Sequence, residues 1–445
     1  MTRPFVWGVG TSAYQIEGAR HAGGKGESVW DRFSDLGRVP GNGDVAADHY
    51  HRLEEDLDLL AGLGIGAYRF STAWTRVVPD GDGRVNQAGL DFYERLISGL
   101  EARDIDPCLT LYHWDLPQAL QDRGGWTSRD TIDAFARYAR IMVESFGDRV
   151  SRWITHNEPW VSAYLGHRDG VFAPGMTGWE TALVAGHNIL VSHGRATAAM
   201  REASRDVVVG IAIDCRPSHP ADEDSLAANK YFDGFRNRWF FDPVFGRGYP
   251  EDMVDAYEER GHLLPSGLGA LVRDGDLDEI ATPIDFIGVN YYTTATIAAG
   301  REESDEPEGR VGPGAPEGFT EMGWRIDPAG LTDFLQRVSE EYAPASILVT
   351  ENGASYGDGP DPEGRIRDER RIEYLDSHIE ATLAARRSGV AVDGYFVWSF
   401  LDNLEWIEGF SQRFGLVWVD DETRRRIPKD SYHWYRNRIS ETTVG

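Results

Sequence analysis

The chain has 445 residues, with 73 Asp and Glu against 45 Lys and Arg, and a formal net charge of −28. This excess of acid argues against a nucleic-acid binder and against docking on anionic lipid, because both partners require basic surface. A hydrophobic content of 41% provides for a large core, and no apolar run approaches the ~18 residues of a membrane span. Cys108 and Cys215 are too few for a disulfide framework. From these features together we expect a soluble, cytoplasmic protein.

Short apolar runs rich in β-branched and aromatic residues predict eight strands, and patterns of 3.6-residue period predict helices between them. The predicted strands are residues 5–11, 67–71, 107–113, 152–157, 207–214, 285–292, 347–351 and 392–399. The predicted helices are residues 54–63, 91–102, 129–146, 179–203, 328–341, 369–387 and 432–438. Eight alternations of strand and helix indicate an α/β fold, a single (β/α)8 TIM barrel with its active site at the carboxyl ends of the strands.

Residues 216–280 and 295–325 are too long for simple connections, and we interpret them as elaborated βα loops. No linker divides the chain, so residues 1–445 are expected to form one catalytic barrel domain. The glycines at positions 62, 64 and 66 resemble a dinucleotide fingerprint, but they precede a strand instead of following one. An oxidoreductase barrel therefore has weak support, and the sequence calls for no cofactor and no metal.

Two glutamates differ from the other acidic residues in their positions relative to the predicted strands. Glu158 ends the fourth predicted strand and Glu351 ends the seventh, so both belong to the same rim of the barrel. Two carboxylates facing a sugar are the minimum apparatus for glycoside hydrolysis. Aromatic and amide side chains suited to carbohydrate accompany them at the predicted rim: Gln15, His113, Trp114, Asn157, Asn290, Tyr292, Trp398, Glu405 and Trp406.

Seven segments in a fixed order together resemble the family-1 glycoside hydrolases, the β-glucosidase family with an eight-fold barrel. They are residues 5–18 (FVWGVGTSAYQIEG), 68–71 (YRFS), 112–117 (YHWDLP), 155–159 (THNEP), 290–292 (NYY), 350–353 (TENG) and 398–406 (WSFLDNLEW). The resemblance covers almost the whole chain. It implies a retaining β-glycosidase that removes terminal β-D-glucosyl residues, with tolerance for β-galactosyl or β-fucosyl groups.

The resemblance also implies roles for individual residues. Glu158 would be the general acid/base and Glu351 the nucleophile, with Arg69, Asn290 and Tyr292 beside them. An arginine and a phenol would keep Glu351 ionised, while Glu158 would remain protonated. The substrate-binding set would comprise Gln15, His113, Trp114, Asn157, Trp398, Glu405, Trp406 and Phe414, with Trp324 as an aglycone platform. Phe172 and His167 depart from the family's pattern, and we expect both near the entrance.

The leading hypothesis is a β-glucosidase that acts in carbohydrate metabolism and cellulose degradation. Two alternative functions remain open. One is a sugar-binding barrel that has lost catalysis. The other is a 6-phospho-β-glucosidase, against which Glu405, Gln412 and Phe414 argue, because an anionic carboxylate would repel phosphate and the other two carry no positive charge. The expected partner is a small-molecule β-glycoside or cello-oligosaccharide, and the sequence leaves the oligomeric state unknown.

Overall fold

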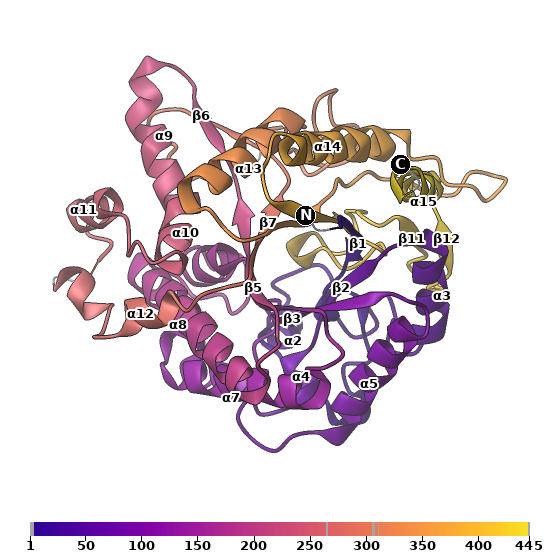
Figure 1. Cartoon of the computed structure of the whole chain (residues 1–445), viewed down its shortest axis with the longest axis horizontal. Coiled ribbons are helices and arrows are strands. Elements are labelled where there is room, and N and C mark those ends of the chain that lie inside the picture. The colour runs from indigo at the N-terminus through magenta and orange to yellow at the C-terminus, as the bar shows by residue number, and fades with distance from the viewer. Residues whose placement is uncertain (1–3, 264–265, 305–307, 310, 444–445) are drawn as a thin grey trace.

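The computed structural model describes residues 4–263, 266–304, 308–309 and 311–443. Within these ranges eight parallel strands close into a barrel in the spatial order β1-β2-β3-β4-β5-β7-β9-β10 (Figure 1). The ends of the predicted domain, and a few residues of the two predicted long loops (264–265, 305–307 and 310), lie outside the described residues. The barrel strands are β1 (Val6–Gly10), β2 (Ala67–Ser71), β3 (Asp106–Tyr112), β4 (Arg152–Asn157), β5 (Val209–Cys215), β7 (Phe286–Tyr291), β9 (Ile347–Asn352) and β10 (Val392–Trp398).

Helices surround the barrel, as Figure 1 shows, and each predicted strand and helix is present with small shifts at its ends. The helices are α1 (Ala13–Ile16), α2 (Val29–Asp35), α3 (Leu53–Leu63), α4 (Trp74–Val77), α5 (Gln87–Glu101), α6 (Gln118–Gln121), α7 (Asp130–Phe146), α8 (Trp179–Ala203), α9 (Leu226–Asp233), α10 (Trp239–Val244), α11 (Glu251–Glu259), α12 (Asp276–Ile280), α13 (Pro328–Tyr342), α14 (Glu369–Arg387) and α15 (Asp430–Thr443). None of these described helices combines the length and apolar character needed to cross a membrane.

The run of glycines after α3 is a helix-to-strand turn. Gly64 ends α3 in the left-handed conformation, with φ 69°, and β2 begins at Ala67. A glycine adopts this backbone at little cost, which explains its place after the last helical residue. The order of elements is helix then strand, which is the reverse of a dinucleotide-binding turn.

The long segment after β5 holds more regular structure than the sequence indicates. It contains β6 (Ser218–Pro220) and the helices α9 to α12, which lie along one side of the barrel in Figure 1. β6 pairs in parallel with β8 (Ala295–Ile297), so the two long segments support one another. A second small sheet, of β11 (Val417–Val419) and β12 (Arg426–Pro428), follows the last barrel strand.

The interior of the barrel is filled by side chains and is not a channel. One residue from each of seven strands forms a compact buried cluster: Ala67, Cys108, Ile154, Ala212, Phe286, Leu348 and Phe396. The ring of Phe396 approaches β1 so closely that a Cβ added at Gly8 would lie 2.4 Å from it. A filled interior leaves the rim formed by the strands' carboxyl ends as the place for a substrate cavity.

Candidate active site

A cavity of about 470 Å³ opens at the carboxyl ends of the strands. Most of the predicted site residues line it: Glu158, Glu351, Asn290, Tyr292, His113, Trp114, Trp398, Glu405, Trp406, Phe414 and Trp324. Gln15, Arg69 and Asn157 are not part of the lining, and each is buried and hydrogen-bonded to a residue that is. The structure therefore brings together all of the residues that the sequence placed at this rim.

Glu351 lies near the end of β9, and both of its carboxylate oxygens have a donor. Arg69 Nη1 donates to Oε1 at 2.6 Å, and the hydroxyl of Tyr292 donates to Oε2 at 2.6 Å. Burial holds the pKa of Tyr292 well above its ordinary value, and the charge of Glu351 raises it further. The phenol thus stays protonated and keeps donating, so the pair stabilises negative charge on this carboxylate.

Glu158 follows β4 directly and lies in a different electrostatic environment. Its backbone N–H donates to the carbonyl of Ala212 in β5 at 2.8 Å, and Asn290 Nδ2 donates to its Oε1 at 2.6 Å. Burial raises the pKa of Glu158 well above the ordinary glutamate value, and the negative charges of Glu351 and Asp214 raise it further. The two carboxyls are therefore differentiated, with Glu158 suited to hold a proton and Glu351 suited to carry charge.

Asn157 connects the two halves of this arrangement. Its Oδ1 accepts from Arg69 Nη2 at 2.6 Å and from Asn290 Nδ2 at 2.9 Å, which fixes the orientation of the amide. The Nδ2 group must then donate to His113 Nε2, at 3.2 Å. Burial lowers the pKa of His113 well below its ordinary value, so the ring is neutral and carries its proton on Nδ1. That buried N–H has no partner among the described residues.

Gln15 and Glu405 form a second polar group in the cavity wall. Gln15 Nε2 donates to Asn403 Oδ1 at 3.0 Å and to the carbonyl of Leu404 at 2.9 Å, and lies 3.5 Å from Glu405 Oε2. Burial raises the pKa of Glu405 to about 8, and the charge of Glu351 contributes. The Glu405 carboxyl is thus largely neutral at pH 7. The exclusion of phosphate accordingly depends less on the charge of Glu405 than the sequence suggested.

Aromatic rings pack around Trp406 in the cavity wall. The rings of Trp30 and Trp114 each lie 4.5 Å from that of Trp406, and Tyr14 stacks on it at 6.0 Å. Trp114, Glu158 and Trp406 all have positive φ angles, of 78°, 50° and 30°. Such backbone is costly for residues with a Cβ and persists where packing on all sides imposes it. The aromatic cluster supplies that packing around Trp114 and Trp406.

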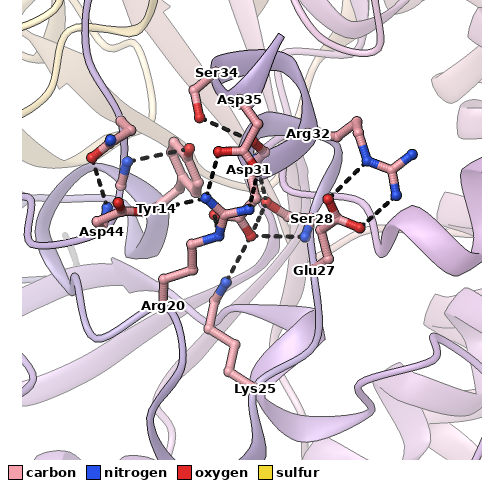
Figure 2. Close-up of polar contacts among 12 residues, drawn as sticks. Tyr14, Arg20, Lys25, Glu27, Ser28, Asp31, Arg32, Ser34, Asp35 and Asp44 are labelled. Carbon is pink, nitrogen blue, oxygen red and sulfur yellow. Dashed lines mark hydrogen bonds and ion pairs between the residues drawn. The ribbon is translucent and has the colours of Figure 1, made fainter.

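The helix α2 contributes Trp30 to this aromatic cluster, and a polar network ties α2 to the segment before it (Figure 2). Arg20 Nη2 lies 2.5 Å from Asp35 Oδ2, and Lys25 Nζ lies 3.0 Å from Asp31 Oδ2. Ser28 and Asp31 form a capping box at the start of the helix, with bonds of 3.1 and 2.8 Å. The long loop after β1 is thereby fixed to the helix that supports the cavity.

The expectation that His167 lies near the entrance is wrong. His167 is buried, its Nδ1 donates to the carbonyl of Ser162 at 2.8 Å, and it does not line the cavity. Phe172 does line it, 5.7 Å from Trp114. Sequence analysis missed Asp214 and Arg236, which line the cavity beside β5 and form an ion pair at 2.7 Å. The only sequence signal for Asp214 was its place at the end of a predicted strand.

No group of three or more His, Cys, Asp or Glu side chains in the described part of the chain is arranged to hold a metal ion. The polar groups at the centre of the cavity are instead carboxyls, amides and one neutral imidazole. They provide paired hydrogen-bonding groups for hydroxyls, beside aromatic faces for the C–H surface of a sugar ring. Carbohydrate chemistry by two carboxyls is what this arrangement can perform.

Comparison with known proteins identifies the class. The sequence model of Glycosyl hydrolase family 1 matches residues 1–443. Beta-glucosidase A of Thermotoga maritima is 45% identical over 97% of this chain and 96% of its own length. A structure of beta-glucosidase from that organism with azafagomine has a TM-score of 0.90, at 44% identity over 99% of this chain and 98% of its own. The bifunctional beta-D-glucosidase/beta-D-fucosidase of Bifidobacterium breve is 40% identical over 98% of this chain and 97% of its own length.

The chain therefore belongs to glycosyl hydrolase family 1. It is a hydrolase of glycosides built on a (β/α)8 barrel, and the family cleaves its substrates with retention of anomeric configuration.

Proposed function

We propose that this protein is a β-glucosidase that releases terminal β-D-glucose from small neutral β-glucosides. The names of its relatives support the substrate, and the relative with fucosidase activity supports tolerance at the 4- and 6-positions, where D-fucose differs from D-glucose. Cello-oligosaccharides are among the proposed substrates, which would give the enzyme a role in cellulose degradation. The observation that carries the proposal is the pair of differentiated carboxyls, with Glu351 held by two donors and Glu158 in an environment that favours its protonated form.

In the first proposed step, Glu158 donates its proton to the glycosidic oxygen while a Glu351 oxygen attacks C1 of the sugar. The bond from C1 to the leaving oxygen breaks, the aglycone departs as an alcohol, and a glycosyl ester forms on Glu351. In the second step, Glu158 takes a proton from water as the water oxygen attacks C1 and the ester bond from C1 to the Glu351 oxygen breaks, which restores the Glu351 carboxylate. Free glucose leaves, and both carboxyls regain their initial protonation states. Two inversions give net retention.

The remaining site residues have proposed positioning and binding roles. Arg69 and Tyr292 orient Glu351 through bonds of 2.6 Å, and Asn290 orients Glu158. Polar groups from several strands would bind the sugar hydroxyls, and aromatic rings would lie on either side of the sugar. The residues proposed for this binding are Gln15, His113, Trp114, Asn157, Trp398, Glu405 and Trp406. Phe414 and Trp324 would contact the substrate beside Tyr292, whose ring lies 6.2 and 5.1 Å from theirs.

Phosphorylated sugars are not proposed substrates. Gln412 is buried with its Oε1 accepting from Ser355 Oγ at 2.6 Å, and Phe414 is apolar, so these two positions supply no positive charge. Because the lining residues range from the segment after β3 to segments beyond β10, we propose that residues 1–445 act as one catalytic domain. We also propose a cytoplasmic location. The two cysteines, Cys108 and Cys215, are separate buried thiols, which is compatible with that location. Limited proteolysis and cell fractionation test these two proposals.

The central test uses Glu351→Ala with methyl β-D-glucoside and an aryl β-D-glucoside. Wild-type protein should release β-glucose first, as seen by NMR, and the variant should lose turnover by several orders of magnitude. Added azide should restore aryl glucoside cleavage by Glu351→Ala and give the α-glucosyl azide, because the small anion occupies the space of the missing carboxylate. Glu340→Ala, which changes an exposed glutamate of α13, is the matched control. Near wild-type activity of Glu351→Ala would refute the assignment.

A further inference from the structure

Thr350 comes immediately before the proposed nucleophile and does not line the cavity. At this point β9 has one more residue than β7. Val289 of β7 pairs with Val349 and Asn290 pairs with Glu351, so Thr350 has no residue opposite it in β7. A bulge of this kind interrupts the regular alternation of side chains along a strand and redirects them. The side chains of two consecutive residues, Thr350 and Glu351, can therefore both reach polar groups of the site.

The neighbouring strand β7 leaves room for the Thr350 side chain. A Cβ added at Gly288 would lie 2.8 Å from Thr350 Oγ1 and 2.9 Å from its Cγ2, closer than ordinary van der Waals contact. Thr350 is buried, and its hydroxyl lies 2.6 Å from Asn290 Oδ1. The close approach to Gly288 thus holds the hydroxyl against this amide.

The direction of the hydrogen bond follows from the groups on the other side of Asn290. A guanidinium can only donate, so Asn157 Oδ1 accepts from Arg69 Nη2. The group of Asn290 that lies 2.9 Å from the same oxygen is therefore its Nδ2, which also donates to Glu158 Oε1 at 2.6 Å. Asn290 Oδ1 then faces Thr350, and the Thr350 hydroxyl must be the donor.

This donor supports the hydrogen bond that Asn290 makes to Glu158. A buried amide oxygen that loses its donor is left unsatisfied, which favours rotation of the amide away from its place. A hydrogen bond to the amide oxygen also polarises the amide and strengthens donation by its N–H groups. Donation to an ionised carboxylate is about twice as strong as donation to a neutral carboxyl. The support therefore matters most after Glu158 has given its proton to the leaving group.

We propose that Thr350 is a positioning residue that acts through Asn290 and keeps an N–H donor on Glu158 while Glu158 is negatively charged between the two steps. The inference rests on the proposed β-glucosidase function. It adds to that function a residue that lies behind the cavity wall.

The other titratable groups around Glu158 stay in place when Thr350 is replaced. They come from β9, from the end of β5, from the turn before α10 and from the residue after β7, and they are Glu351, Asp214, Cys215, Arg236 and Tyr292. An uncharged substitution at Thr350 therefore acts on Glu158 through the hydrogen bond from Asn290. This bond lowers the pKa of Glu158, so its loss raises that pKa.

The test is the pH profile of methyl β-D-glucoside hydrolysis by Thr350→Val, in which a methyl group replaces the hydroxyl. The basic limb of kcat/KM reports the loss of the Glu158 proton in the free enzyme, and it should move upward by about one pH unit. Thr350→Ala also lacks the hydroxyl and should move the limb in the same direction, so it carries the test if the valine variant does not fold. Thr350→Ser keeps the hydroxyl and should restore the wild-type limb.

Thr110→Val is the matched control. Thr110 is buried in β3, and its hydroxyl has no hydrogen-bond partner among the described residues. Its basic limb should coincide with that of the wild type. Inhibition by glucose should be the same in all of these variants, because neither threonine lines the cavity.

Different outcomes separate this inference from the function on which it rests. If the wild type does not hydrolyse methyl β-D-glucoside or an aryl β-D-glucoside, the proposed function fails, and the inference fails with it. If the wild type is active but the limb of the hydroxyl-free variants does not move, or moves downward, the inference alone is overturned. An equal upward shift in Thr350→Ser or in Thr110→Val would also overturn it.

Discussion

The substitution Asp115→Asn should change how the stability of this protein depends on pH. Asp115 follows Trp114 after β3 and is 1% exposed, and neither of its carboxylate oxygens has a hydrogen-bond partner among the described residues. Burial raises the pKa of Asp115 to about 7, from an ordinary value of 3.8. The positive charge of Lys25 opposes this shift, and the negative charge of Glu17 adds to it.

The expected magnitude follows from that shift. A carboxyl with a raised pKa keeps its proton in the folded state after the unfolded state has lost it, so folding stability falls as pH rises. Each pKa unit corresponds to about 1.4 kcal/mol. For a shift of roughly three pKa units, the free energy of unfolding of the wild type should fall by up to about 4 kcal/mol as the pH rises. The Asn variant has no charge at this position and should not show this fall. About 3 kcal/mol of this loss falls between pH 5 and pH 8.

Urea unfolding at pH 5, 6, 7 and 8 measures the effect as a difference between variant and wild type. The free energy of unfolding of Asp115→Asn, relative to the wild type, should rise by about 3 kcal/mol over this range. The matched control is Asp106→Asn, at the exposed start of β3, for which the difference should stay constant. A constant difference for Asp115→Asn as well would refute the assignment of a neutral buried carboxyl at this position.

Three further predictions concern catalysis. Tyr292→Phe removes the 2.6 Å bond to Glu351, a charge-assisted bond worth about 1.5–3 kcal/mol, so kcat/KM should fall about 10- to 150-fold; a fall below threefold would contradict this. Glu158→Gln should slow methyl β-glucoside hydrolysis by about 10²–10⁴ and slow glycosylation by 2,4-dinitrophenyl β-glucoside far less, since that leaving group needs no proton; equal losses would argue against an acid role. Because the charge of Asp214 raises the pKa of Glu158, Asp214→Asn should move the basic limb of the kcat/KM profile to lower pH, and no movement would count against this coupling.

Features set by local patterns could be predicted from the sequence. The eight barrel strands are short apolar runs, and each is found within a few residues of its predicted bounds. Glu158 and Glu351 could be placed together because both end parallel strands of one barrel, so their distance in sequence did not matter. The hydrogen bonds from Arg69 and Tyr292 to Glu351 agree with the environment that the family resemblance implied.

Features that depend on how loops pack could not be predicted. The helix α10 has six residues and contains Pro243, so it is too short to show an apolar period. Arg236 lies in the turn just before it, and only the folded segment brings it to Asp214.

The central claim is that Glu351 becomes covalently bound to the sugar, and trapping that intermediate tests it most directly. With 2,4-dinitrophenyl 2-deoxy-2-fluoro-β-D-glucoside, the fluorine slows both steps, while the activated leaving group allows the first to proceed, so the glycosyl enzyme should accumulate. Digestion and mass spectrometry should then find one fluoroglucosyl group, attached to Glu351. A label on Glu158 or on another carboxyl, or turnover of natural substrates with no trapped ester, would contradict the account.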